Sequence, residues 1–150
     1  CHGRGRSNVL SAAFRTRRFH QEEAEITRTA LEALRLLGIE DRAREMVGNL
    51  PFGQQRLVDI ARAVAVRPVL LLLDEPAAGL NARETADLVS VITQLRQQGI
   101  TIMLIEHDMD VVMGIADRII VLNQGEKIAE GVPGEIQRNP DVIAAYLGEE

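Results

Sequence analysis

A run of four leucines, Leu70 to Leu73, constrains the fold of this chain more than any other stretch. An unbroken aliphatic run of this length predicts a strand that is buried on both faces of a parallel sheet. Asp74 and Glu75 follow directly, and parallel α/β sheets bind their ligands at the carboxyl ends of the strands. The run therefore predicts an α/β fold with two acidic side chains at its ligand-binding edge.

The two carboxylates suit different tasks in phosphate chemistry. Asp74 is placed to hold a hydrated Mg²⁺, an ion that takes few protein carboxylates and completes its shell with water and substrate phosphates. Glu75 is placed to orient or deprotonate an attacking water. Acidic pairs also serve as helix caps or ion-pair partners, so the rest of the sequence must decide between these interpretations.

Two other segments carry residues that suit a bound phosphate. Gly53 and Gln54 begin a predicted helix, whose free N–H groups and dipole favour an anion, and glycine permits close approach. His107 lies two residues beyond Ile105, the end of a second apolar run. An imidazole there can hydrogen-bond a phosphate oxygen and respond to its loss. A helix that merely starts with glycine and a structural turn histidine are the ordinary alternatives.

The order and spacing of four motifs resemble the nucleotide-binding subunit of an ABC transporter. The motifs are Leu50-Pro51-Phe52-Gly53-Gln54-Gln55-Arg56 (signature loop), Leu70 to Glu75 (Walker B and catalytic Glu), Ala78-Gly79-Leu80-Asn81 (D-loop) and His107 (switch histidine). The strings DEPAAGLN, IEHDMDVVMGIADRI and NPDVIAAYLG are most similar to the ATPases of branched-chain amino-acid importers. The resemblance extends over almost the whole chain.

This resemblance implies a P-loop NTPase-like three-layer α/β fold with an N-terminal helical subdomain. Residues 1–48 would form part of that subdomain, and residues 49–150 the C-terminal half of the nucleotide-binding core. ATP and Mg²⁺ would be the cofactors, with Asp74 holding the metal through water and with Glu75 and His107 as the catalytic residues. The ATP of a partner protomer would contact the signature loop, namely Pro51, Phe52, Gly53, Gln54 and Gln55. Asn81 takes the D-loop position, where many relatives have Asp.

The resemblance also implies partners and a location. The chain would pair with a second ATPase subunit and with transmembrane permease subunits, and would serve a periplasmic binding protein indirectly. It would lie peripherally on the cytoplasmic face of the inner membrane. Two alternatives stay open: a truncated, non-catalytic dimerisation or docking module, and an ABC ATPase for another cargo such as exported lipopolysaccharide.

No G-x-x-x-x-G-K-[ST] sequence, the phosphate loop of such ATPases, occurs in the 150 residues. The resemblance places that loop, the adenine-stacking aromatic residue and the Q-loop glutamine upstream of the matched region. We therefore expect the chain to be the C-terminal portion of a longer ATPase. The central strand of the sheet would also lie upstream, so we expect a gap between the strand before His107 and the strand Arg118 to Leu122.

Hydrophobic periodicity and helix-capping residues predict the remaining elements. Residues 1–48 are predicted to be helical, with the clearest helical period over residues 21–37, Gly38 as the stop and a short helix over residues 40–45. Further helices are predicted over residues 53–66, 81–98 with Asn81 as the N-cap, 108–115 with Asp108 as the N-cap, 134–138 and 141–147. Strands are predicted over residues 69–73, 100–105, 118–122 and 127–129, the last two joined by a turn at Gln124-Gly125.

Charge is distributed unevenly along the chain, whose net charge is −5. The first 20 residues carry Arg4, Arg6, Arg15, Arg17 and Arg18 and no acidic residue. Such an arm is either a solvated surface or a site that lies close to anionic lipid headgroups. Nucleic acid is not an expected partner, because only three phenylalanines and one tyrosine could stack on bases.

Overall fold

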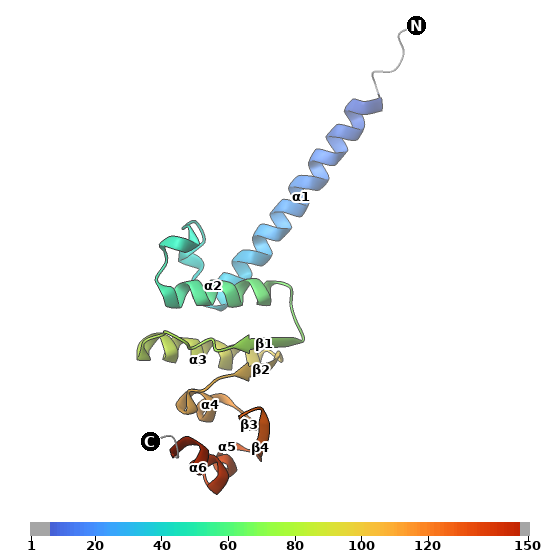
Figure 1. Cartoon of the computed structure of the whole chain (residues 1–150). Coiled ribbons are helices and arrows are strands. Elements are labelled where there is room, and N and C mark those ends of the chain that lie inside the picture. Colours follow the sequence, from blue (N-terminus) through green and yellow to red (C-terminus); the bar gives the residue numbers. More distant parts are fainter. Residues whose placement is uncertain (1–6, 148–150) are drawn as a thin grey trace. The chain divides into compact units, whose positions relative to one another are not determined.

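The computed structural model describes residues 7–147 of the chain, in two compact units, Cys1–Pro68 and Val69–Glu150 (Figure 1). The first unit is helical and the second is mixed α/β. The first unit contains α1 (Ser7–Leu36), the 3₁₀ turns η1 (Glu40–Arg42) and η2 (Val47–Asn49), and α2 (Phe52–Ala65). The second contains β1 (Leu70–Asp74), α3 (Ala82–Gln97), β2 (Thr101–Ile105), α4 (Met109–Ile115), β3 (Ile119–Asn123), β4 (Glu126–Gly131), α5 (Pro133–Ile136) and α6 (Pro140–Leu147).

In the first unit, α1 packs against α2 around a small apolar core. Gly38, at φ 71°, ends α1: its N–H donates to the Arg35 carbonyl at 3.0 Å, and the Ile39 N–H donates to the Leu34 carbonyl at 3.0 Å. This is a Schellman motif, in which glycine adopts the left-handed conformation at lowest cost. The predicted helix stop is therefore confirmed.

The prediction of a helical N-terminal segment holds from Ser7 on: α1 continues from Ser7 to Leu36, and residues 7–20 contain no glycine or proline and include strong helix formers such as Ala, Leu and Arg. The helix predicted over residues 40–45 is only the short turn η1. The side chains of the five arginines lie outside the described residues, so the expectation of a basic arm stays a prediction.

In the second unit, β1 and β2 pair in parallel, from Leu70 opposite Thr101 to Asp74 opposite Ile105. Helix α3 connects them and packs against β2, with Leu88, Val91, Ile92 and Leu95 buried. Asn81 begins α3 with the predicted capping box: its Oδ1 accepts from the Arg83 and Glu84 N–H groups, and the Glu84 carboxylate accepts from the Asn81 N–H. This β–α–β arrangement is typical of α/β folds with parallel sheets.

The prediction that the leucine strand is buried on both faces is wrong. Leu71 and Leu73 are buried, but Leu70 and Leu72 are 49% and 65% exposed, and Met103 and Ile105 of β2 are 57% and 56% exposed. Alternate side chains of a strand point to opposite faces of its sheet. The burial therefore alternates along β1, with a covered face and an open apolar face.

Strands β3 and β4 form an antiparallel hairpin, joined at Gln124 and Gly125. Both turn residues have positive φ angles, 50° and 83°, as a type I′ turn requires. Ile119 of β3 and Ala129 of β4 form a buried cluster with Ile136 of α5 and Val142 of α6. Within the described residues, the β1–β2 and β3–β4 sheets are separate, so β2 does not pair with β3. A gap of one strand between them stays a prediction.

Most element bounds agree with the predictions within one or two residues. Strand β1 is shifted by one residue towards Asp74, and β4 is longer than predicted, because the pairing with β3 continues to Gly131. The predicted division into residues 1–48 and 49–150 stays a prediction. The boundary between the two compact units falls after Pro68, because α2 packs on α1. In the described part of the chain, no helix is long and apolar enough to cross a membrane.

Candidate functional site

The carboxyl end of β1 holds the predicted acidic pair. Asp74 is the last strand residue and pairs with Ile105, and the Glu75 N–H extends the ladder by donating to the Ile105 carbonyl at 2.9 Å. Glu75 has a φ of 43°, and its carbonyl accepts from the Ala78 N–H at 3.1 Å. Positive φ is uncommon outside glycine, and such strained residues cluster at functional sites. The chain thus turns sharply at Glu75 and leaves its side chain at the edge of the sheet.

The carboxyl end of β2 brings His107 to the same edge. His107 Nδ1 lies 3.5 Å from Glu75 Oε1, and the two side chains are 71% and 53% exposed. Parallel pairing brings the Glu75 and His107 side chains together, because both strands end at the same edge of their sheet. An exposed pair of this kind contributes little to stability, about 0–1 kcal/mol. Both groups are therefore accessible to a ligand at this edge.

Glu106 is a part of the site that the sequence analysis did not assign. Its side chain is only 1% exposed. Its Oε1 accepts from the Ala77 N–H at 2.8 Å, and its Oε2 accepts from the His107 N–H at 3.3 Å. The carboxylate therefore joins the turn after β1 to the turn after β2. The only signal in the sequence is a charged residue between a buried strand and a candidate histidine.

Asp74 fits the expected role in holding Mg²⁺. Its side chain is exposed and forms no hydrogen bond or ion pair with any described residue, so both oxygens are free. Among the described residues, no three His, Cys, Asp or Glu side chains cluster closely enough to hold a metal by themselves. A single free carboxylate suits Mg²⁺, which takes its other ligands from water and substrate phosphates.

Asn81 and Asp108 are N-caps in the structure. The Asn81 side chain accepts two backbone N–H groups of α3, and Asp108 Oδ1 accepts from the Asp110 and Val111 N–H groups at 3.0 and 3.2 Å. Both caps confirm the predicted helix starts. The D-loop role of Asn81 towards a nucleotide stays a prediction.

The signature segment lies in the first unit, at the start of α2. Pro51 is the N-cap residue, Gly53 is buried, and Gln55 Nε2 donates to the Leu50 carbonyl at 2.8 Å. The side chains of Phe52 and Arg56 stack, with the guanidinium 5.6 Å from the ring centroid, which is within the range of a cation–π contact.

Two buried polar atoms of the signature segment are without a protein partner. They are Gln54 Oε1 and Arg56 Nε. Asp74, Glu75 and His107 come together in the second unit, whereas the signature residues belong to the first.

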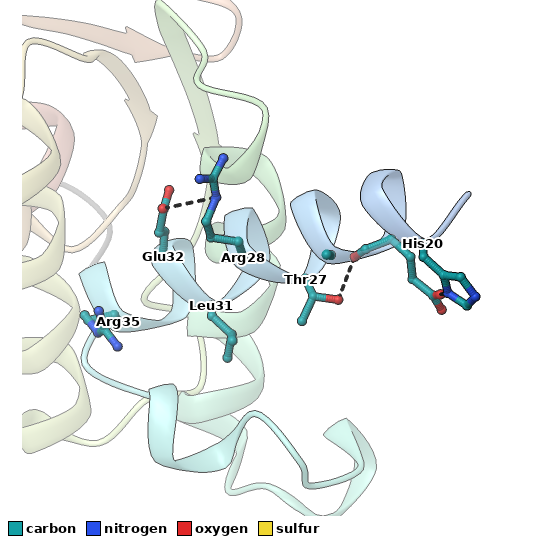
Figure 2. Close-up of a pocket in the computed structure, with 8 residues that line it drawn as sticks. His20, Thr27, Arg28, Leu31, Glu32 and Arg35 are labelled. Atoms are coloured by element: carbon teal, nitrogen blue, oxygen red, sulfur yellow. Dashed lines mark hydrogen bonds and ion pairs between the residues drawn. The ribbon is translucent and has the colours of Figure 1, made fainter. Parts of the chain in front are cut away.

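An open pocket of about 610 Å³ lies along α1. Figure 2 shows the side chains that line it. Its lining residues all come from one helix: His20, Glu23, Ala24, Thr27, Arg28, Leu31, Glu32 and Arg35. The polar groups there form short-range pairs, such as the Thr27 hydroxyl donating to the Glu23 carbonyl at 2.8 Å. None of the predicted site residues lines it, so this pocket is not the candidate site.

The parallel β–α–β unit, with Asp-Glu at the end of one strand and histidine after the next, agrees with the predicted P-loop NTPase-like α/β fold. The chain belongs to the ABC transporter family, whose sequence profile matches residues 4–78. A second profile, described as branched-chain amino acid ATP-binding cassette transporter, matches residues 126–150. The resemblance inferred from the motifs is confirmed.

Individual relatives agree with this assignment. The high-affinity branched-chain amino acid transport ATP-binding protein BraF of Pseudomonas aeruginosa is 47% identical over 144 residues, 95% of this chain and 56% of BraF. LivG of Salmonella typhimurium, described in the same words, is 46% identical over 149 residues, 99% of this chain and 58% of LivG. The chain therefore spans just over half the length of these relatives.

Solved structures support the fold. The ADP conformation of MJ1267, an ATP-binding cassette of an ABC transporter, superposes with a TM-score of 0.77 at 32% sequence identity. The match covers 83% of this chain and 51% of MJ1267. The predicted α/β, P-loop NTPase-like class is confirmed.

Proposed function

We propose that the protein is the ATP-binding and ATP-hydrolysing subunit of an ABC importer for branched-chain amino acids. The observation that carries the proposal is the distance of 3.5 Å between Glu75 Oε1 and His107 Nδ1 at the ends of two paired parallel strands. Identities of 46–47% to LivG and BraF support the cargo class.

In this proposal, the two exposed groups act on one attacking water and one phosphate. Glu75 orients the water and accepts its proton, since its carboxylate is accessible and lies within reach of a ligand at the sheet edge. His107 donates a hydrogen bond to an oxygen of the transferring phosphate. Catalysis then depends mainly on positioning and electrostatics, as in other phosphoryl transfers.

Asp74 would hold Mg²⁺ through water, beside the same edge. A bound Mg²⁺ would supply positive charge that offsets the negative charge of the ATP phosphates. No other described residue forms a hydrogen bond or ion pair with the Asp74 carboxylate, so this carboxylate is free to orient the hydrated ion.

The signature loop would complete the site of a second ATPase subunit. Gly53 and Gln54 lie in the first turn of α2, where the free N–H groups of the helix favour an anion. Pro51, Phe52 and Gln55 complete the loop, and Asn81 would form the D-loop. We propose a head-to-tail pair of ATPase subunits, docked to permease subunits on the cytoplasmic face of the inner membrane and served indirectly by a periplasmic binding protein.

The test is ATP hydrolysis by the subunit expressed from its whole coding sequence and reconstituted with its permease partners. Leucine-loaded binding protein is expected to stimulate the rate, and a binding protein for another cargo is not. Hydrolysis without stimulation by any branched-chain amino acid would favour another cargo. A complex that assembles but does not hydrolyse ATP would favour the non-catalytic docking module.

The 150 residues by themselves are proposed to be inactive, because no G-x-x-x-x-G-K-[ST] sequence occurs in them. The amides and lysine of that loop normally hold the β- and γ-phosphates. Titration calorimetry of the 150-residue chain with Mg-ATP is expected to show no saturable binding, and micromolar affinity would contradict this.

A further inference from the structure

A closed ring of contacts joins the residues of the candidate site to one another. The Glu106 carboxylate accepts from the Ala77 N–H at 2.8 Å and from the His107 N–H at 3.3 Å, and His107 Nδ1 lies 3.5 Å from Glu75 Oε1. The backbone from Glu75 through the 75–78 turn to Ala77 completes the ring. One buried side chain thus links the two turns that carry the predicted catalytic groups.

The burial of Glu106 sets it apart from its neighbours. Its side chain is 1% exposed, whereas that of His107 is 71% exposed. A buried carboxylate is costly unless its oxygens accept hydrogen bonds, and each oxygen of Glu106 accepts a backbone N–H. Without Glu106, the Ala77 and His107 N–H groups would lose these acceptors. Glu106 therefore holds the two turns rather than facing a ligand.

We infer that Glu106 is the positioning residue that sets the geometry between Glu75 and His107. It fixes the Ala77 N–H and hence the turn that displays Glu75, and it fixes the backbone at His107 directly. The Glu106 Oε2 atom also lies 4.0 Å from His107 Nδ1, which is the imidazole nitrogen that faces Glu75. The inference rests on the proposed function, since it concerns the same reaction.

The first test compares steady-state ATP hydrolysis by the reconstituted subunit and its Glu106 variants. Glu106→Ala removes both acceptors and is expected to lower kcat about 10-fold to 100-fold, because small misplacements of reacting groups have effects of this size. The KM for ATP is expected to change less than about twofold, since Glu106 lies outside the proposed phosphate contacts. Glu106→Gln keeps one acceptor oxygen and is expected to fall between Glu106→Ala and the wild type.

The matched control is Glu135→Gln. Glu135 also uses a carboxylate oxygen to accept a backbone N–H, that of Val132 at 3.3 Å, but at the start of α5. It is expected to keep the wild-type kcat. A wild-type kcat in Glu106→Ala would overturn the inference. A loss of kcat in proportion to the loss of ATP-binding sites would also overturn it, because misfolding would then explain the loss of kcat.

The second test measures amide hydrogen exchange at Ala77 and His107. Both amides are expected to exchange at least about tenfold faster in Glu106→Ala than in Glu135→Gln, because Glu106→Ala removes both oxygens that accept from them. Unchanged exchange would overturn the inference even in a protein that hydrolyses no ATP. A wild-type subunit without ATPase activity would instead refute the proposed function, so the two failures are distinguishable.

Discussion

The two sheets of the second unit are both two-stranded, yet different interactions hold them. In the β3–β4 hairpin, Asn123 pairs with Glu126 across a turn of two residues with positive φ. In the β1–β2 pair, Leu70 pairs with Thr101, which is 31 positions away (101 − 70). The hairpin follows from local sequence, whereas the parallel pair depends on α3 and on packing. The candidate site lies on the non-local pair, where Glu106 ties the two strand ends together.

The largest expected effect is at the parallel pair. Glu75→Gln, in the subunit expressed from its whole coding sequence, is expected to lower kcat about 10²-fold to 10⁴-fold, the range for loss of a general base. ATP affinity is expected to persist, because the amide keeps the size of the side chain. A turnover assay beside equilibrium ATP binding checks both points, and near-wild-type turnover would remove Glu75 from the role of base.

A second prediction separates the covered and open faces of β1. Leu71→Ala is expected to lower the free energy of unfolding by about 2–5 kcal/mol, as for other buried leucines. Leu72→Ala, its neighbour on the open face, is expected to change it by about 0.5 kcal/mol. Urea titration of the 150-residue chain measures both. Equal losses would mean that the open face is covered in solution and would restore the prediction of burial on both faces.

A smaller effect is expected in the hairpin turn. Gly125→Ala places a side chain at φ 83° and is expected to destabilise the chain by about 1–2 kcal/mol. No atom lies within 4 Å of the added Cβ, so the cost comes from the backbone conformation alone. Urea titration beside Gly134→Ala, another glycine with open space around its Cβ, is the control. Equal effects of the two substitutions would argue against a type I′ turn.

The smallest expected effect is the acid sensitivity of the hairpin. Hydrogen bonds from Lys127 and Arg118 hold the pKa of the Glu130 carboxyl below its ordinary value. This contribution to stability is therefore present above the ordinary carboxyl pKa and is lost as the pH falls through the lowered one. Melting temperatures measured down to acidic pH are expected to fall more steeply for the wild type than for Glu130→Gln. Parallel curves would show that this network does not stabilise the hairpin.

Local features of the fold were predictable, and features that depend on distant residues were not. The Gly38 stop, the Asn81 capping box and the Gln124-Gly125 turn each follow from a few adjacent residues. The open face of β1 could not be predicted in this way. A run of leucines shows that a strand is apolar, but not which of its faces other elements cover. The helical character of the N-terminal segment was predicted, and α1 agrees with it from Ser7 on.

The candidate site shows the same division. Asp74, Glu75 and His107 were predicted from their places at the ends of apolar runs, and β1–β2 pairing brings Glu75 and His107 within 3.5 Å. The role of Glu106 was missed because its carboxylate accepts a hydrogen bond from the N–H of Ala77, which is 29 positions away. No pattern of neighbouring residues predicts that bond. A carboxylate next to a histidine does not by itself indicate whether it faces ligand or backbone.

The central claim is that Glu75 and His107 act as one catalytic unit. A double-mutant cycle in the reconstituted subunit tests it most directly, with Glu75→Gln, His107→Ala and the double variant compared by kcat. Residues that act as a unit are non-additive, so the double variant is expected to lose little more than Glu75→Gln alone. If the loss in the double variant equals the product of the two single losses, the two residues act independently and the account is contradicted.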